Sequence, residues 1–173
     1  MSSIKLLFVI LLFICFTGSK LFSQDMTPPK PVDNKVYESM VGVWTGENSM
    51  MGMKMNETVT VKWGLNHQFV IFDYKATSKD NSAMSYNGLG IYGVDANGNA
   101  LGWWFDDWGA TSMATGSGTF SENKLEMNSS NAMFKENRVF EVKGNDMTMT
   151  AKGSYSVNGK DVPFNETNVY KKK

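Results

Sequence analysis

Residues 51–63 alternate between apolar and polar side chains, and this pattern constrains the fold more than any other feature of the chain. The odd positions carry Met51, Met53, Met55, Glu57, Val59, Val61 and Trp63. Glu57 is the single member of that set that is not apolar, and the even positions carry no apolar side chain. Because successive side chains of a strand point to opposite faces, the segment is predicted to be an antiparallel strand with one buried face.

Further short runs are predicted to be strands, and turn-forming residues separate them. These runs are Phe69–Ala76, Ser85–Val94, Ala100–Asp106, Thr111–Phe120, Lys124–Ser129, Glu136–Lys143, Met147–Ser156 and Pro163–Tyr170. The pairs Asn97-Gly98 and Asn158-Gly159 suit tight hairpins, since both residue types tolerate a positive φ. With a first strand beginning at Val43, the total is about nine or ten strands.

A short helix is predicted before the first strand. Asp33 or Asn34 can cap its N-terminus. The helix includes Tyr37 and Met40 and ends at Gly42. Many short strands joined by hairpins are typical of a sandwich or an up-and-down barrel, and the preceding helix favours a barrel with one plugged end. The predicted fold class is therefore all-β, an up-and-down antiparallel barrel with a short N-terminal helix.

Residues 1–24 have the pattern of a secretory signal peptide. Lys5 supplies a positive charge, and Leu6–Phe16 is a run of eleven apolar residues. That run is shorter than the roughly 20 residues that a membrane-spanning helix needs. Cleavage is expected near Ser23 or Gln24. It would remove Cys15, the single cysteine of the chain, whose bulky neighbours argue against a lipoprotein site. The protein is therefore expected to be exported, either to the periplasm or to the extracellular space.

The remaining chain divides into a linker and one domain. Residues 25–32 hold three of the four prolines and are expected to be extended. Residues 33–173 are expected to form the barrel domain. The exported chain would carry 15 basic and 17 acidic side chains, because Lys5 and Lys20 are lost from the 17 basic residues of the whole sequence. This balance gives no positive surface for nucleic acid.

Several motifs resemble those of a known family. Gly42–Trp44, which directly follows the predicted helix, resembles the Gly-x-Trp motif of lipocalins. Gly88–Asp95, which reads Gly-x-Gly-x-Tyr-Gly-x-Asp, and then Trp104–Asp106 follow in an order similar to that of a bacterial lipocalin-like, calycin-type domain family of unknown function. The resemblance covers roughly residues 38–171. It implies a lipocalin-like barrel and little about function.

A distantly related group, the nitrobindin-like barrels, implies haem as an alternative ligand. Those barrels hold the iron through a His on a late strand. The single His of this chain, His67, lies in the turn before Phe69–Ala76 instead. A haem here would need Tyr155, Tyr170 or a Met as its ligand. No cofactor is therefore predicted.

The methionines at positions 51, 53 and 55 are candidate binding residues. Alternation places Met51, Met53 and Met55 on one face of the predicted strand. Thioethers pack adaptably, so they suit a core or a pocket for apolar ligands. They are also the soft ligands that Cu(I) prefers, which leaves copper binding as an alternative.

Glu57 and Arg138 are the charged candidates. Glu57 interrupts the apolar face of its strand, and a buried carboxylate needs a partner. Three arrangements are open. Glu57 pairs with Arg138 inside the barrel, or Arg138 stacks on Trp44 as an Arg does in lipocalins, or Glu57 lies beyond the rim in water.

Aromatic residues complete the candidate site. Phe69, Tyr92, Trp104 and Asp106 are added as ligand-binding residues. Trp104 is expected to face the opposite way from Trp103 and Phe105, and the cluster belongs either to the core or to the wall of a cavity. Asp106 and Asp107 point to opposite faces of a strand, so they cannot act together on one substrate.

The sequence thus favours an exported protein that holds a small, mainly apolar molecule without covalent bonds in a barrel lumen. The alternatives are a haem or Cu(I) binder, an enzyme built on the barrel, and a structural barrel with a filled interior. No catalytic residue is nominated, because no residue stands in a triad or a Gly-x-Ser-x-Gly context. No nucleic-acid partner and no stable membrane span are predicted, and no oligomeric state is assigned.

Overall fold

The computed structural model describes residues 27–50 and 52–173. The predicted signal peptide with Cys15, and the candidate residue Met51, lie outside the described residues. Residues 27–34 form neither helix nor strand. Residues 31–173 form one compact unit, and the site lies entirely within it.

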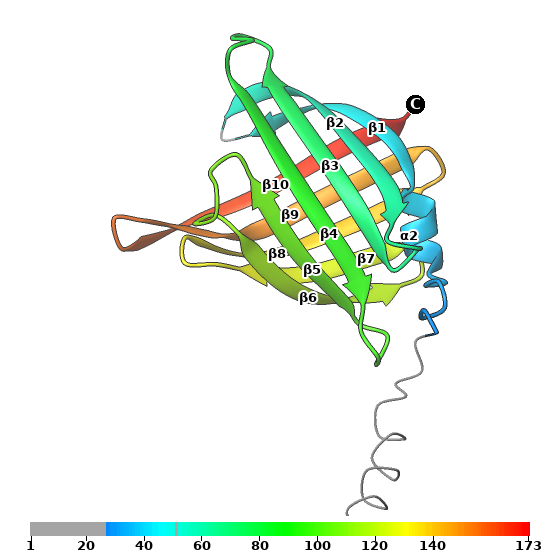
Figure 1. Ribbon diagram of the computed structural model, residues 1–173. Helices are drawn as coiled ribbons and strands as arrows, with labels where there is room; N and C mark the ends of the chain where they lie inside the picture. The colour runs from blue at the N-terminus through cyan, green and yellow to red at the C-terminus, as the bar shows by residue number, and fades with distance from the viewer. Residues whose placement is uncertain (1–26, 51) are drawn as a thin grey trace, which may run out of the picture. The chain divides into compact units, whose positions relative to one another are not determined.

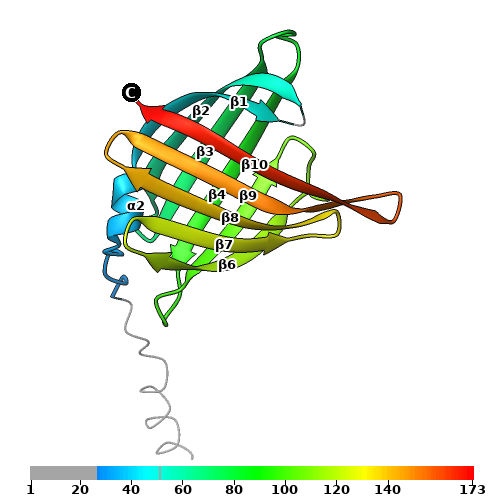
Figure 2. The same ribbon diagram turned by 180° about the vertical axis from the view of Figure 1, so that it is seen from behind.

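Ten antiparallel strands follow one another around a closed barrel over the described residues. They are β1 (Gly42–Met50), β2 (Met53–Gly64), β3 (Phe69–Ser78), β4 (Ser85–Val94), β5 (Ala100–Asp106), β6 (Ala114–Ser121), β7 (Lys124–Ser130), β8 (Phe134–Lys143), β9 (Asp146–Val157) and β10 (Lys160–Lys172). Each strand pairs with the next, and β10 closes the barrel by pairing with β1. Figure 1 shows the wall that contains β3, β4 and β5, and Figure 2 shows the opposite wall, which contains β7 to β10. The predicted up-and-down antiparallel barrel is confirmed.

Helix α2 (Lys35–Met40) precedes β1 and lies at one end of the barrel (Figure 1). Asn34 is its N-cap: the side-chain Oδ1 accepts hydrogen bonds from the backbone N–H groups of Val36 and Tyr37, both at 3.0 Å. The predicted short helix is confirmed, with Asn34 rather than Asp33 as its cap. No helix within residues 27–50 and 52–173 is long and apolar enough to cross a membrane.

The alternation in β2 corresponds to a strand with one buried face, as predicted. Met55, Glu57, Val59 and Val61 are buried, whereas the even-numbered side chains between them are exposed or partly exposed. Residues of the same phase on the neighbouring strands, such as Phe72 on β3, are buried as well. The buried face of each strand therefore lines the inside of one barrel.

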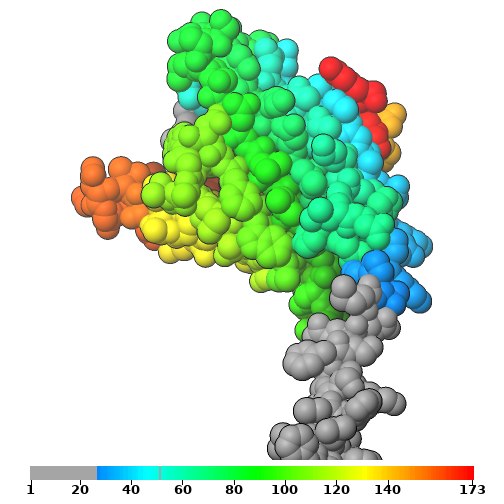
Figure 3. Space-filling view, in the orientation of Figure 1, coloured from blue at the N-terminus to red at the C-terminus, as the bar shows by residue number. Residues whose placement is uncertain are grey.

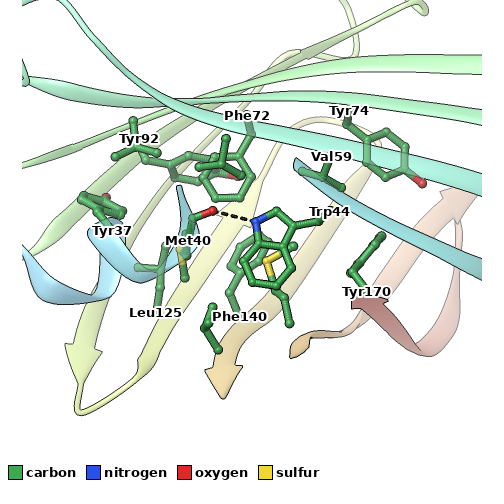
Figure 4. Packing of buried hydrophobic residues seen from close by; sticks show 14 of the residues in the cluster. Tyr37, Met40, Trp44, Val59, Phe72, Tyr74, Tyr92, Leu125, Phe140 and Tyr170 are labelled. Atoms are coloured by element: carbon green, nitrogen blue, oxygen red, sulfur yellow. Dashed lines mark hydrogen bonds between the residues drawn. The ribbon is translucent and has the colours of Figure 1, made fainter. Parts of the chain in front are cut away.

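The end of the barrel next to α2 is filled by a hydrophobic cluster (Figure 4). Trp44 is fully buried there, and its indole Nε1 donates a hydrogen bond of 2.7 Å to the backbone oxygen of Met40. The Tyr37 hydroxyl donates a hydrogen bond of 3.1 Å to the backbone oxygen of Gly93 on β4. The ammonium of Lys172 lies 5.1 Å from the centre of the Trp44 ring. Helix α2 thus closes this end, as the sequence predicted.

Glycines on the inner face of β4 make room for two aromatic rings. A Cβ built on Gly88 would lie 2.1 Å from Cζ2 of Trp104, and one on Gly90 would lie 2.6 Å from Cε2 of Tyr92. Such distances are far below van der Waals contact, so any larger residue would push a ring away. Glycine at positions 88 and 90 therefore allows the rings of Trp104 and Tyr92 to pack directly against the backbone on the inner face of this strand.

Candidate functional site

The lumen is accessible to water from the end opposite α2. On β8, the inward-facing side chains Phe134, Glu136 and Arg138 are partly exposed, whereas Phe140, nearer the helix, is buried. Met149 on β9, which pairs with Phe140, is partly exposed as well. In the space-filling view a small opening lies beside the β5–β6 segment (Figure 3). Water therefore reaches into the outer half of the barrel along β8 and β9, whereas Met55 on β2 and Ala76 on β3 are buried.

A cavity of about 20 Å³ lies where the accessible half of the lumen meets the filled half. Its lining combines aromatic rings, thioethers and a few polar groups. The lining residues are Val59, Phe72, Tyr74, Trp104, Arg138, Phe140, Met147, Met149 and Tyr170. A space of this size holds about one water molecule. A larger ligand must therefore move side chains, and the unbranched Met147, Met149 and Arg138 are the ones that move most readily.

Glu57 is buried, with 2% of its surface exposed, and it contacts Tyr170, a lining residue of this cavity, although Glu57 itself does not line it. The Tyr170 hydroxyl donates a hydrogen bond of 2.6 Å to Oε2 of Glu57, and Asn48 Nδ2 donates one of 3.0 Å to the same oxygen. The other oxygen, Oε1, is buried without a hydrogen-bond partner among the described residues. Since a buried acceptor without a donor costs about 1–3 kcal/mol, this atom is a place where a ligand could gain binding energy.

The two phenols beside Glu57 are held in their protonated form. Burial raises the pKa of Tyr170 far above its ordinary value, and the neighbouring Glu57 carboxylate raises it further. Burial also raises the pKa of Tyr74, to which the proximity of Tyr170 and of Glu57 adds. Both side chains therefore present a neutral hydroxyl to the carboxylate.

Arg138 pairs with a residue that the sequence analysis did not nominate. Its Nε and Nη2 donate hydrogen bonds of 3.0 and 2.9 Å to the two carboxylate oxygens of Glu136, and its Nη1 lies 3.2 Å from Sδ of Met149. Glu136 and Arg138 are two residues apart on β8, so both point into the lumen. That spacing is the signal in the sequence from which this pair could have been predicted.

None of the three arrangements expected for Glu57 and Arg138 is present. Arg138 pairs with Glu136 rather than Glu57. Lys172, rather than Arg138, lies over the Trp44 ring. Glu57 lies inside the barrel and not beyond its rim. Glu57 instead contacts Tyr170, which is on the last strand. Because the two residues are far apart in the sequence, no local pattern predicts this contact.

Asp106 belongs to a second group of polar side chains near the open end. The Tyr86 hydroxyl donates a hydrogen bond of 2.9 Å to Asp106 Oδ2 and accepts one of 3.1 Å from Trp104 Nε1. The Ser112 hydroxyl donates to Asp106 Oδ1. Asp107 accepts instead from the backbone and side chain of Asn87. Asp106 therefore joins β4, β5 and the segment before β6, and Asp107 acts separately, as expected. The strand predicted from Thr111 begins only at Ala114, because Ser112 belongs to this turn.

The other nominated residues fall into two groups. Met53 and Met55 are on the inner face of β2, on the same side as Glu57, and Tyr92 is buried in the core, with its ring centre 5.0 Å from that of Phe72. Phe69 is on the outer face of β3, where its ring centre lies 6.4 Å from that of Trp103. Phe69 therefore does not line the lumen, and its nomination as a ligand-binding residue stays a prediction.

His67 lies at the helix end of the barrel. It is exposed, and its ring stacks on Trp63 with the ring centres 4.9 Å apart. The single His of the chain is therefore far in the fold from the accessible half of the lumen, which begins at the other end.

A wider depression of about 420 Å³ lies on the outer surface of β5, β6 and β7. It is lined by Leu101, Gly102, Trp103, Thr115, Gly116, Ser117, Asn128 and Ser130. None of these lining residues is charged, and the depression is shallow. The chemically distinctive groups of the described structure are in the lumen instead.

No family model and no curated protein matches this chain. The closed antiparallel barrel is consistent with a lipocalin-like fold in general. The bacterial family that the Gly-x-Trp and Trp-x-Asp motifs resemble is supported by those motifs alone. Function must therefore be argued from the geometry of the lumen.

Proposed function

We propose that this protein is an exported binding protein that holds a small, mainly apolar molecule without covalent bonds in the outer half of its barrel. One observation carries this proposal: an aromatic and thioether cavity lies at the bottom of a lumen that water enters from the end opposite α2. Concave, mostly apolar sites with a few polar groups are typical of small-molecule binding.

The side chains around the cavity explain how a ligand larger than one water is accommodated. Met147 and Met149 have several rotatable bonds, and Met149 and Arg138 are partly exposed. Their displacement toward the open end would enlarge the cavity while the rigid rings of Phe72 and Phe140 stay in place. Affinity would come from apolar surface removed from water, at about 25 cal/mol per Å².

Native mass spectrometry tests the proposal. The purified protein is measured alone and after exposure to a lipid extract, to haemin and to Cu(I). We expect an adduct from the lipid extract that is lost on denaturation. A haemin or Cu(I) adduct in its place would support the haem or copper alternative, and a bare polypeptide under all conditions would overturn lumen binding.

A pair of variants on β9 locates the adduct. Met149→Trp fills the accessible lumen, whereas Thr148→Trp places the same bulk on the outer face of the strand. We expect the adduct to be lost in Met149→Trp and retained in Thr148→Trp. Equal adducts in both variants would place the ligand outside the lumen and contradict the proposal.

A further inference from the structure

We infer that the polar end of the ligand is a cation, an organic ammonium group that lies against Oε1 of Glu57. This inference rests on the proposed function and names the chemistry of its ligand. The observation behind it is a carboxylate that is 2% exposed, whose Oε1 has no hydrogen-bond partner among the described residues, and whose neighbours Tyr170, Asn48 and Tyr74 are all neutral.

The charges that face the lumen do not balance at this point. The guanidinium of Arg138 is matched by the carboxylate of Glu136, which it contacts through two nitrogens. Glu57 receives hydrogen bonds from Tyr170 and Asn48, which are both neutral. Asp106 also accepts from neutral donors, so its charge adds to that of Glu57. A positive ligand would offset this excess, because a buried charge without a counter-charge is costly.

The surroundings of Glu57 suit an ammonium group in shape and in chemistry. The faces of aromatic rings attract cations, and the cavity wall includes Phe72, Tyr74, Trp104 and Tyr170. A primary ammonium carries three N–H donors and is close to water in size, so the cavity of about 20 Å³ would hold such a head. Glu57 is not among the lining residues, so contact with Oε1 requires a lining side chain such as Tyr74 or Tyr170 to move. The apolar tail would then extend toward the open end, past Met149.

Other head groups fit less well. A carboxylate would be repelled by Glu57, and to reach Arg138 it would have to displace Glu136 from a two-bond contact. An alcohol could donate one hydrogen bond to Oε1 of Glu57 but would leave the negative charge unmatched. Arg138 also lines the cavity, and its guanidinium is neutralised by Glu136, whereas Glu57 has neutral donors only. On that balance of charges the site favours the ammonium over both.

A matched series of eight-carbon ligands tests this order. Binding of octylammonium, 1-octanol and octanoate to the wild-type protein is measured by isothermal titration calorimetry. We expect octylammonium to bind at least about tenfold more tightly than 1-octanol, since a charge-assisted hydrogen bond is roughly twice as strong as a neutral one, and octanoate to bind most weakly. Octyltrimethylammonium, which has no N–H donor, is expected to bind more weakly than octylammonium.

Variants assign the preference to one carboxylate. In Glu57→Gln we expect octylammonium affinity to fall about tenfold and 1-octanol affinity to change less than threefold. Glu47→Gln, on the outer face of β1 and paired with Lys79 in water, is the matched control and should leave both affinities unchanged. The wild-type series decides the order of ligands even if Glu57→Gln does not fold.

The outcomes separate this inference from the proposed function. If 1-octanol or octanoate binds as tightly as octylammonium and Met149→Trp blocks them, the lumen binds ligands but the cationic head is wrong. If the preference survives in Glu57→Gln, the assignment to Glu57 is wrong. If no member of the series binds and native mass spectrometry shows no adduct, both the inference and the proposed function fail.

Discussion

The hydroxyl of Tyr170 donates a hydrogen bond of 2.6 Å to Glu57, across 113 positions of the chain. Strand β1 lies between the two strands that carry these residues. The bond crosses β1 at Gly46, where a Cβ would lie 3.1 Å from Cδ1 of Tyr170 and 2.3 Å from the backbone oxygen of Val169. A residue without a side chain on the middle strand therefore lets two polar groups meet inside the barrel.

Loss of the Tyr170 hydroxyl is predicted to destabilise the protein. Tyr170→Phe leaves Asn48 as the remaining donor to Glu57, and we expect the free energy of unfolding to fall by about 1–3 kcal/mol in urea denaturation. Combined with Glu57→Gln in a double-mutant cycle, the two changes should be coupled by about 0.5–3 kcal/mol. Tyr155→Phe near the open end, where the ring stacks on Phe164, is the control. Additive effects of the two substitutions would contradict the contact.

Gly88→Ala is predicted to disturb Trp104. The added methyl group would overlap the indole ring, so we expect a loss of about 1–3 kcal/mol of stability and a change in the tryptophan fluorescence of the folded protein. The control is Leu89→Ala, the next residue, which is exposed on the outer face of β4. If the two variants unfold at the same urea concentration with unchanged spectra, the close approach of Trp104 to Gly88 is wrong.

Lys172 is predicted to stabilise the closed end through its position over Trp44. Lys172→Met keeps the length of the side chain and removes its charge, and we expect it to lower stability by about 0.5–1 kcal/mol in thermal unfolding. Lys172→Arg should retain most of the effect, because a guanidinium also binds to the face of an indole. A Lys172→Met variant as stable as the wild type would show that the cation contributes nothing there.

The tyrosines predict a loss of stability at alkaline pH. Burial raises the pKa of Tyr92 to about 12 from an ordinary value of 10.0, and Glu136 adds to the rise while Arg138 opposes it. Burial raises the pKa of the remaining tyrosines too, and these are Tyr37, Tyr74, Tyr86, Tyr155 and Tyr170. The folded protein thus holds more protons than the unfolded chain above pH 10, so stability is fully present below about pH 10 and falls as the pH rises toward 12 and beyond.

Ultraviolet titration of the phenolate measures this effect. At about pH 11 we expect the folded protein to show little phenolate absorbance, whereas the chain unfolded in guanidinium should show nearly full ionisation of its six tyrosines. The midpoint of urea unfolding should move to lower concentration between about pH 10 and 12. Phenolate formation in the folded protein at about pH 10 would contradict the burial of these hydroxyls.

The fold could be predicted because the strands of this barrel have one buried face. The period-two pattern of β2 identified its apolar face from the sequence alone, whereas it left open whether Glu57 on that face lies inside the barrel or beyond its rim. In β3 the same reasoning could not place Phe69, because apolar residues occupy both phases of Phe69-Val-Ile-Phe72 and the pattern does not say which phase is inside. The tertiary structure resolved the ambiguity in favour of Val70 and Phe72.

The partners inside the lumen could not be predicted for a different reason. Alternation assigns a side chain to a face, but it does not give its depth or its neighbours across the barrel. The pairing of Arg138 with Glu136 is local and was visible in principle as two opposite charges on one face of β8. The contact between Glu57 and Tyr170 depends on how β10 closes against β1, which no local pattern reveals.

That closure also determines the order in which the molecule can assemble. Strand β1 joins β10 through the pairs Trp44–Lys172 and Thr45–Lys171, so the first and last strands must meet before the sheet has no free edge. Until then, a growing sheet exposes unpaired backbone groups on both sides, which is the condition that favours aggregation. Contacts so distant in sequence slow folding. The pairing of β10 with β1 therefore completes the interior around Glu57. The same step removes the unpaired strand edges through which the chain could aggregate with other chains.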